Sequence, residues 1–288
     1  MMKLSKLLQL NPKVDLWLSY TWSSNDHGIC GHVYEVIDYY MILKSHFNVG
    51  ILFAERFELD LSKYDFTEEE IDGIHKAITY CDKPSLLKGT NILFTDGGVV
   101  NNKDKVLLFD SVLYFACGNK GVKDNDKDNV YILQDDRVYD PVKKNGINYK
   151  KRILLDRLKP IVVHKDRPMV YATTNCREAD LTGLPSNTLV ISNKEYEGFE
   201  CVEPPLRNIF EEFHTFIYTE VPRHWDCSPR FIVECKYHDK EVVYHNIDYW
   251  EEDKGLYWRK WDIDNDFDSL YLKEDDEIIC IIKQVLSN

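Results

Sequence analysis

The sequence of 288 residues has no run of about 20 consecutive apolar residues, the length that a membrane-spanning helix requires. It also lacks the apolar core and small-residue cleavage site of a secretory signal peptide. None of its eight cysteines forms a Cys-x-x-Cys pair, and most have apolar sequence neighbours, where a free thiol behaves as a small hydrophobic group. We therefore expect no membrane partner and a reducing, cytoplasmic environment.

An excess of positive charge is also lacking, because 36 Lys and Arg face 49 Asp and Glu, for a formal net charge of −13. This balance disfavours proteins that bind nucleic acid through general electrostatics, which need a basic surface. A local exception is a basic cluster formed by Lys143, Lys144, Lys150, Lys151 and Arg152. Such a run is either a solvated helix face or a surface that follows a phosphate backbone, and both readings stay open.

Short apolar runs typical of strands alternate with amphipathic helical patterns in both halves of the chain, which predicts an α/β fold with parallel sheets. Strands are expected at 14–20, 49–54, 92–94, 107–108, 111–116, 130–134, 169–173, 189–192, 216–219 and 242–245. Helices are expected at 32–46, 68–81, 150–158 and 205–213, and from 228 onward. The pattern restarts after the charged, proline-containing stretch 159–168, so we expect two domains, 1–163 and 164–288.

The most informative stretch is 218–235, which predicts the end of a strand, a polar loop and a helix beginning at Ser228-Pro229. A helix N-terminus attracts phosphate, and Arg230 adds a cation in the first turn. Glu234 follows one turn later, where a carboxylate can accept hydrogen bonds from two ribose hydroxyls. The grouping suits a nucleotide diphosphate with its sugar. The alternative is an ordinary capped helix with surface charges.

Residues 218–245, with the core Asp-Cys-Ser-Pro-Arg-Phe-Ile-Val-Glu-Cys, resemble the donor-binding motif of GT-B glycosyltransferases. In that family an Arg and a Glu at the start of a helix hold the diphosphate and ribose of a nucleotide sugar. The resemblance implies that Ser228, Arg230 and Glu234 bind the donor. It also implies two Rossmann-like domains that face a central cleft: an acceptor-side N-terminal domain and a donor-binding C-terminal domain.

Two further loops resemble donor-binding loops of the same family. Gly28 and Gly31 follow the first expected strand, and their small size allows the backbone to approach a ligand closely. The stretch from Tyr171 to Arg177 resembles a Tyr-Gly-Gly-Ser-x-Arg phosphate loop, although Ala172 and Thr173 replace the glycines and one residue is added. The alternatives are a tight turn with exposed histidines in the first loop and a solvated Arg in the second.

The expected strand 130–134 is followed by Asp135, Asp136 and Arg137, which places carboxylates at the end of a strand. This segment resembles the strand-Asp-x-Arg stretch of the bacteriophage DNA 5-hydroxymethylcytosine glycosyltransferases. The resemblance implies that Asp135 is the general base for the acceptor hydroxyl and that Arg137 lies on the acceptor side. Asp136 stands where the family has an apolar residue, so the base could be shifted by one position. A surface Asp–Arg pair is the alternative.

No obligatory metal or cofactor is expected. His27 and His32 have no third ligand at a suitable spacing, and the Asp-x-Asp pairs of the acidic tract 262–277 are interpreted as solvated turns.

As a whole, the resemblance implies an enzyme that transfers glucose, or a pentose such as arabinose, from a UDP-sugar to 5-hydroxymethylcytosine in DNA. We expect the protein to be a monomer. Lys150, Lys151 and Arg152 would then contact the DNA, in the host cytoplasm if a phage encodes the protein. Two alternatives remain. One is a glycosyltransferase that acts on a cell-surface glycan or a protein, which the acidic net charge favours. The other is a non-catalytic nucleotide-binding module.

Overall fold

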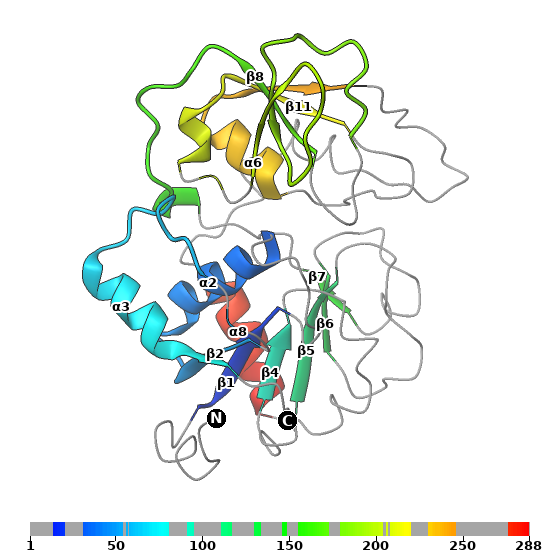
Figure 1. The fold of residues 1–288 in the computed structure, drawn as a ribbon. Helices are drawn as coiled ribbons and strands as arrows, with labels where there is room; N and C mark the ends of the chain where they lie inside the picture. Colours follow the sequence, from blue (N-terminus) through cyan, green and yellow to red (C-terminus); the bar gives the residue numbers. More distant parts are fainter. Residues whose placement is uncertain are drawn as a thin grey trace. The chain divides into compact units, whose positions relative to one another are not determined.

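The computed structural model is an α/β fold with two sheets of parallel strands (Figure 1). It describes residues 14–20, 31–53, 56, 58–80, 91–94, 111–116, 130–133, 146–148, 155–172, 179–203, 206, 208–219, 230–245 and 276–287. The chain divides into two compact units, and it passes from one to the other four times. Unit 1 comprises Met1–Leu59, Phe66–Leu154 and Ser269–Asn288, and unit 2 comprises Asp60–Asp65 and Leu155–Asp268.

Unit 1 contains a seven-stranded sheet in the described part of the chain, in the order β3-β2-β1-β4-β5-β6-β7, with every neighbouring pair parallel. The strands are β1 Leu16–Ser19, β2 Val49–Phe53, β3 Ile78–Tyr80, β4 Asn91–Phe94, β5 Ser111–Ala116, β6 Val130–Leu133 and β7 Gly146–Asn148. The helices are α2 Gly31–Leu43, α3 Glu68–Ala77 and α8 Asp276–Leu286. Helix α2 packs against β1 and β2, and α3 packs against β2.

The centre of unit 1 is the pair β1–β2, in which every residue is buried. Continuous apolar strands of this kind are typical of parallel sheets that are covered on both faces. The one polar side chain of β1, Ser19, donates a hydrogen bond to the Leu52 carbonyl at 2.8 Å. Gly50 in β2 is required by packing, because a Cβ atom there would lie 2.5 Å from the Trp17 ring.

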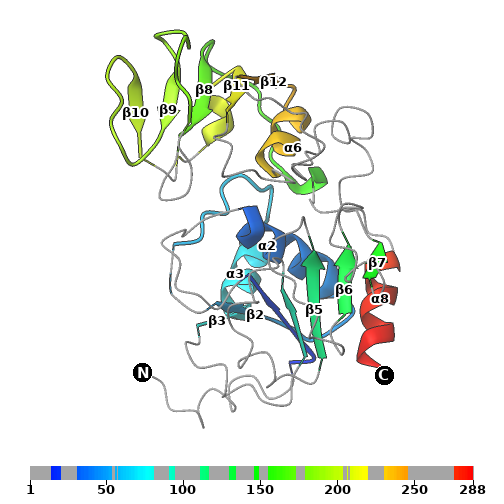
Figure 2. The ribbon, with the colours of Figure 1, turned by 90° about the vertical axis from the view of Figure 1, so that its right-hand side faces the viewer.

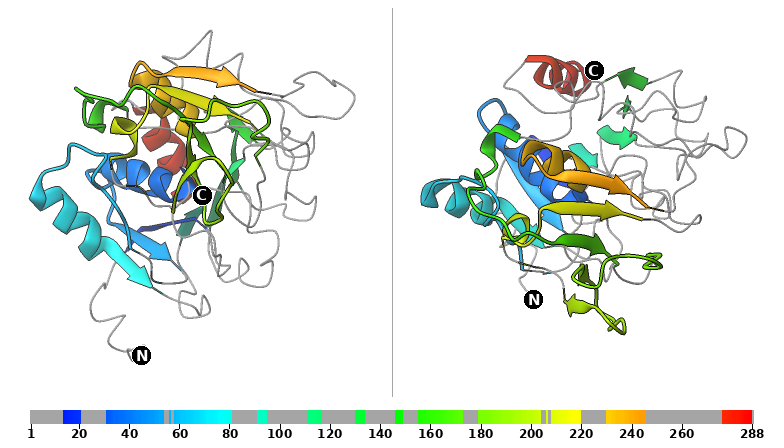
Figure 3. Two further views of the ribbon diagram at one scale, coloured as in Figure 1. Left: turned by 45° about the horizontal axis from the view of Figure 1, so that its top comes forward. Right: turned by 90° about the horizontal axis from the view of Figure 1, so that it is seen from above.

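Unit 2 contains a five-stranded parallel sheet in the described residues, in the order β10-β9-β8-β11-β12 (Figure 2). The strands are β8 Pro168–Tyr171, β9 Leu189–Ile191, β10 Glu200–Val202, β11 Thr215–Tyr218 and β12 Glu241–Tyr244. Helix α6 spans Arg230–Tyr237, packs against β12 (Figure 3), and is accompanied by the short 3-10 helices Leu155–Arg157 and Ile209–Glu211.

Aromatic side chains surround the first turn of α6 in unit 2. The Phe231 ring of α6 stacks on Phe210 at 5.1 Å between centroids and meets Phe216 edge to face at 4.9 Å. Phe213, which is fully buried, lies 6.2 Å from the same ring. Offset and edge-to-face contacts are the preferred geometries of aromatic pairs. They fix α6 against the sheet, and so they fix the position of the first turn of α6.

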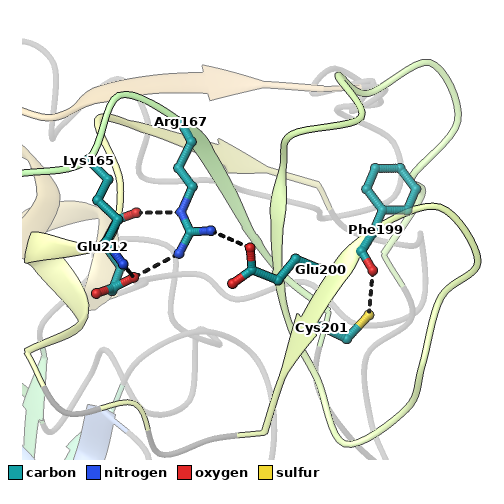
Figure 4. Close-up of polar contacts among 6 residues, drawn as sticks. All are labelled: Lys165, Arg167, Phe199, Glu200, Cys201 and Glu212. Atoms are coloured by element: carbon teal, nitrogen blue, oxygen red, sulfur yellow. Dashed lines mark hydrogen bonds and ion pairs between the residues drawn. The ribbon is translucent and has the colours of Figure 1, made fainter.

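Charged residues close the amino-terminal edge of the unit 2 sheet (Figure 4). Arg167, directly before β8, donates from Nη2 to the Glu212 carboxylate and from Nη1 to Glu200, both at 2.7 Å, and from Nε to the Glu212 carbonyl at 2.9 Å. Lys165 pairs with Glu212 as well. These cations lower the pKa of the Glu212 carboxyl. The hydrogen bond from Lys165 has the largest effect, and Arg167 adds to it. The network ties the starts of β8, β10 and β11 together, opposite the carboxyl ends where ligands bind in such sheets.

Both sheets share one order of strands. In each sheet the first strand of the unit, β1 or β8, lies in the interior of the sheet. The next two strands are added on one side of it, and the remaining strands are added on the other side. This is the doubly wound order, and it is compatible with a Rossmann-like arrangement in both units. The order reverses between β1 and β4 in unit 1 and between β8 and β11 in unit 2. In open parallel sheets, ligands bind at the carboxyl ends of the strands that flank such a reversal.

The structure confirms the predicted α/β class and most strands, including β5 with the bounds predicted for it. It corrects the helix expected at 68–81, because the chain becomes extended at Ile78 (φ −76°, ψ 127°) and continues as β3. Ile, Thr and Tyr all favour strands. Helices were expected at 150–158 and 205–213; among the described residues of these ranges, only the short 3-10 helices Leu155–Arg157 and Ile209–Glu211 form. The strand expected at 107–108 lies outside the described residues.

The division into units differs from the predicted domains 1–163 and 164–288 in three respects. The main crossing falls at 154/155, residues 60–65 join unit 2, and the chain returns to unit 1 at its C-terminal end. That return is visible in α8, whose Lys283 and Leu286 line a surface hollow together with Asp15. Among the described residues, no helix has both the length and the apolar character that a membrane crossing requires.

Candidate functional site

A buried ionic cluster in unit 2 contains two of the side chains that the sequence singles out. Arg230 is the first residue of α6, and Glu234 lies one turn later on the same face, because residues four apart are neighbours on a helix. The Arg230 Nε atom donates to Glu234 Oε1 at 2.6 Å. Their exposed fractions are only 6% and 2%, so the sequence placed the pair correctly along the helix but did not foresee this depth of burial.

The remaining members of the cluster come from Asp60–Asp65, here called the inserted segment. Lys63 Nζ donates to Glu234 Oε1 at 2.7 Å, so two cations share one carboxylate oxygen. The Tyr64 hydroxyl, which is buried, accepts a hydrogen bond from Arg230 Nη2 at 3.0 Å. Neither residue was predicted from the sequence. No local pattern indicates them, because Lys63 and Glu234 are 171 positions apart.

Backbone hydrogen bonds hold the inserted segment in place. Tyr64 forms an antiparallel bridge with Leu158. The amide of Asp65 donates to the Arg157 carbonyl at 2.7 Å, and the amide of Lys159 donates to the Lys63 carbonyl at 2.9 Å. The inserted segment is therefore part of unit 2, although the residues on both sides of it belong to unit 1.

Burial and charge act in opposite directions on Glu234. Burial alone raises the pKa of this carboxyl, but the charges of Lys63 and Arg230, and then their hydrogen bonds, bring the pKa below its ordinary value. Glu234 is therefore ionised at neutral pH and can only accept hydrogen bonds.

Two neighbours of Glu234 are held neutral. Burial raises the pKa of the Cys235 thiol well above its ordinary value, and the Glu234 charge adds to the effect. Burial also lowers the pKa of His238 to about 4, against the opposing attraction of Glu234. Neither group is a reactive nucleophile or a cation at neutral pH, so neither adds a charge to the cluster of Lys63, Arg230 and Glu234.

The cluster lies beside the point where the strand order of unit 2 reverses. Helix α6 follows β11, and the Phe231 ring of its first turn lies 6.0 Å from Tyr171, the last residue of β8. Two predicted site residues, Arg177 and Ser228, come after β8 and β11 in the sequence. Both lie outside the described residues.

In unit 1, Gly31 is the first residue of α2, as the predicted turn into a helix requires, while Gly28 lies outside the described residues. The His32 ring stacks on Tyr20 at 5.7 Å and shares a hydrogen bond of 3.0 Å with the buried carboxylate of Glu35. Asp38, also on α2, is fully buried. Neither acid was predicted as a buried residue, because the helical pattern of this segment rests on its apolar residues alone.

The predicted base and acceptor residues also follow unit 1 strands. Strand β6 ends at Leu133, two residues before Asp135. Since the sheet is entirely parallel in its described strands, β6 ends at the same edge as β1 and β4. Asp135, Arg137, Lys150, Lys151 and Arg152 lie outside the described residues. Within the described residues, no group of three or more His, Cys, Asp or Glu side chains could hold a metal ion.

No protein-family model, curated protein or solved structure matches this chain significantly. The described residues therefore define the protein only as an α/β protein with two parallel sheets and a buried Arg–Glu–Lys cluster at the start of α6.

Proposed function

We propose that the protein is a GT-B-like glycosyltransferase whose donor is a UDP-sugar. The observation that carries the proposal is the Arg230–Glu234 pair, which occupies the first turns of the helix after β11, beside the reversal of strand order in unit 2. Parallel sheets bind nucleotides at this position, and a helix N-terminus with an Arg suits a diphosphate. An ionised Glu that cannot donate suits the two hydroxyls of a ribose.

In this proposal both units are Rossmann-like domains. Arg230, together with Arg177 and Ser228, binds the diphosphate, and Gly28 and Gly31 allow close backbone approach to the donor. Glu234 binds the ribose through Oε2, because Oε1 already accepts from two cations. Asp135 takes the proton of the acceptor hydroxyl as this oxygen attacks the anomeric carbon.

The proposed acceptor is 5-hydroxymethylcytosine in DNA, flipped out of the duplex or otherwise exposed. The basic residues Lys150, Lys151 and Arg152, which follow the proposed base in sequence, support this choice on a chain of net charge −13. They would neutralise phosphates of the DNA backbone, and Arg137 would lie on the acceptor side, closer to the proposed general base Asp135.

An assay of transfer tests the function directly. The full chain is incubated with UDP-glucose or a UDP-pentose and with DNA that contains either 5-hydroxymethylcytosine or cytosine, and the digested nucleosides are analysed by mass spectrometry. We expect the mass of one sugar residue to be added to 5-hydroxymethylcytosine alone. Transfer to a glycan or a peptide instead would replace the proposed acceptor, and UDP binding without any turnover would favour a non-catalytic nucleotide-binding module.

Replacing either member of the proposed donor pair should weaken UDP binding. Glu234→Gln and Arg230→Ala each remove a charge-assisted hydrogen bond to the ligand, a loss of about 1.5–3 kcal/mol, or roughly 10- to 150-fold in affinity. Isothermal titration calorimetry with UDP measures the effect. Glu200→Gln, which alters a carboxylate at the amino-terminal edge of the same sheet, is the matched control and should bind as the wild type does. Unchanged affinity in both folded donor-pair variants would remove the donor-site assignment.

A further inference from the structure

The inserted segment supplies the partners of both proposed donor-site side chains in unit 2. Lys63 contacts the Glu234 carboxylate, and Tyr64 accepts from the Arg230 guanidinium. The segment leaves unit 1 at Leu59 and returns to it at Phe66, so its contacts with α6 are not a consequence of helix formation or of the sheet. A structural role alone would not require that two successive side chains of this segment meet the two residues of α6 that the nucleotide motif singles out.

We propose that Lys63 and Tyr64 are positioning residues for the nucleotide: they hold Glu234 and Arg230 in the orientation that receives the ribose and the diphosphate of a UDP-sugar. This inference rests on the proposed function and assigns to the inserted segment a part in donor binding.

Preorganisation is the physical reason for the effect. Arg and Glu side chains have several rotatable bonds, and ordering them when the ligand arrives reduces affinity. Here Arg230 and Glu234 are hydrogen-bonded to each other and to the inserted segment within a buried site. Their side chains are therefore already ordered in the free protein. Lys63 has a second effect, because its charge helps to keep the buried carboxylate ionised.

Three variants of the full chain separate these effects. Lys63→Met keeps the length of the side chain and removes its charge, and Tyr64→Phe removes only the hydroxyl that accepts from Arg230. Lys165→Met is the matched control, because Lys165 also pairs with a carboxylate in unit 2 but lies at the amino-terminal edge of the sheet and is well exposed. Circular dichroism and thermal unfolding identify the variants that are folded at the assay temperature.

Calorimetry with UDP provides the first readout. We expect the dissociation constant to rise at least about 10-fold in Lys63→Met and about 3- to 10-fold in Tyr64→Phe, and to stay at the wild-type value in Lys165→Met. In the double variant Lys63→Met/Glu234→Gln, the loss should be no greater than in Glu234→Gln alone, because Lys63 acts through Glu234. If Lys63→Met does not fold, Tyr64→Phe decides the question.

The pH dependence of UDP affinity provides a readout that a merely structural role would not change. Glu234 is faced by Lys63 and Tyr64 from the inserted segment and by Arg230, Cys235 and His238 from its own helix and the residue after it. Without Lys63, burial moves the pKa of Glu234 upward, and the carboxylate is lost as the pH falls through the raised pKa. The ratio of variant to wild-type dissociation constants should therefore grow as the pH is lowered from about 8 to about 5.5. This ratio cancels the titration of the phosphate of UDP.

The outcomes distinguish the two levels of the proposal. If the wild-type protein shows no saturable UDP binding, the proposed function fails and this inference fails with it. If the wild type binds UDP and the folded variants of Lys63 and Tyr64 bind equally well, the inference fails and the proposed function stands. Additive losses in the double variant, or a ratio that does not change with pH, would likewise assign Lys63 to stability alone.

Discussion

Replacing Asp135 by asparagine is expected to lower the rate of sugar transfer by about 100- to 10,000-fold, the usual contribution of a general base. Asparagine keeps the shape of the side chain but cannot take up the proton of the acceptor hydroxyl. UDP affinity should stay close to the wild-type value, because a base acts on the transition state and not on the bound donor. Single-turnover transfer and calorimetry with UDP measure the two quantities.

Asp136→Asn is the matched control, because the same chemical change is made one position further along the chain. Strand β6 ends at Leu133, and side chains alternate across a sheet, so neighbouring residues after a strand do not serve the same ligand unless the loop turns. If Asp136→Asn is inactive and Asp135→Asn is active, the base is at position 136. If both variants transfer sugar at the wild-type rate, the base is not in this segment.

The sequence predicted the strands that carry an apolar run and missed shorter strands that do not. Leu-Trp-Leu-Ser in β1 and Val-Gly-Ile-Leu-Phe in β2 carry their own signal, because a strand buried on both faces is continuously apolar. Edge strands β7 and β10 have three residues each, Gly-Ile-Asn and Glu-Cys-Val, and the structure pairs each with a single neighbour. These residues form strands because they pair with a neighbouring strand, and not because of their own β propensity.

Helix α8 shows a different limit of sequence analysis. Ile278, Ile279, Ile281 and Ile282 are buried and lie at helical spacing, so the signal was present. No helix was predicted here, because only the Asp-x-Asp pairs of the preceding acidic tract were interpreted, as solvated turns. The return of these residues to unit 1 depends on long-range packing, which no pattern within the last 20 residues contains.

The candidate site was predictable to the extent that it is local. Arg230 and Glu234 form one turn of one helix, and their spacing in the sequence places both on one face. The contribution of Lys63 was not predictable, because the acidic stretch from Asp60 to Asp72 carries no binding motif and the partner of Lys63 is 171 positions away. The burial of Glu234 changes its chemistry as well. The sequence indicated either a ribose-binding carboxylate or a surface charge, whereas the structure buries Glu234 in contact with two cations.

Removing the Glu234 carboxylate should destabilise unit 2 strongly. Glu234→Ala leaves Arg230 and Lys63 without the carboxylate oxygen that they share, and breaking a buried ion pair from one side typically costs about 3–5 kcal/mol of the free energy of unfolding. Urea unfolding followed by tryptophan fluorescence and circular dichroism measures the change. Asp72→Ala, which breaks an exposed Lys–carboxylate pair on α3, is the matched control and should unfold at the wild-type midpoint.

A compensating variant separates unpaired charge from lost packing. Lys63→Met, Arg230→Met and Glu234→Leu together replace the whole ionic cluster by apolar side chains of similar length. Because replacing all members of a buried ionic group by apolar residues is often neutral or stabilising, this triple variant should recover most of the stability that Glu234→Ala loses. It should nevertheless fail to bind UDP, because both proposed ligands of the nucleotide are gone. If the triple variant is stable but does not bind UDP, the ionic cluster is needed for ligand binding and not for folding. Wild-type stability in Glu234→Ala would contradict the burial of the pair, and UDP binding by the triple variant would move the donor site away from α6.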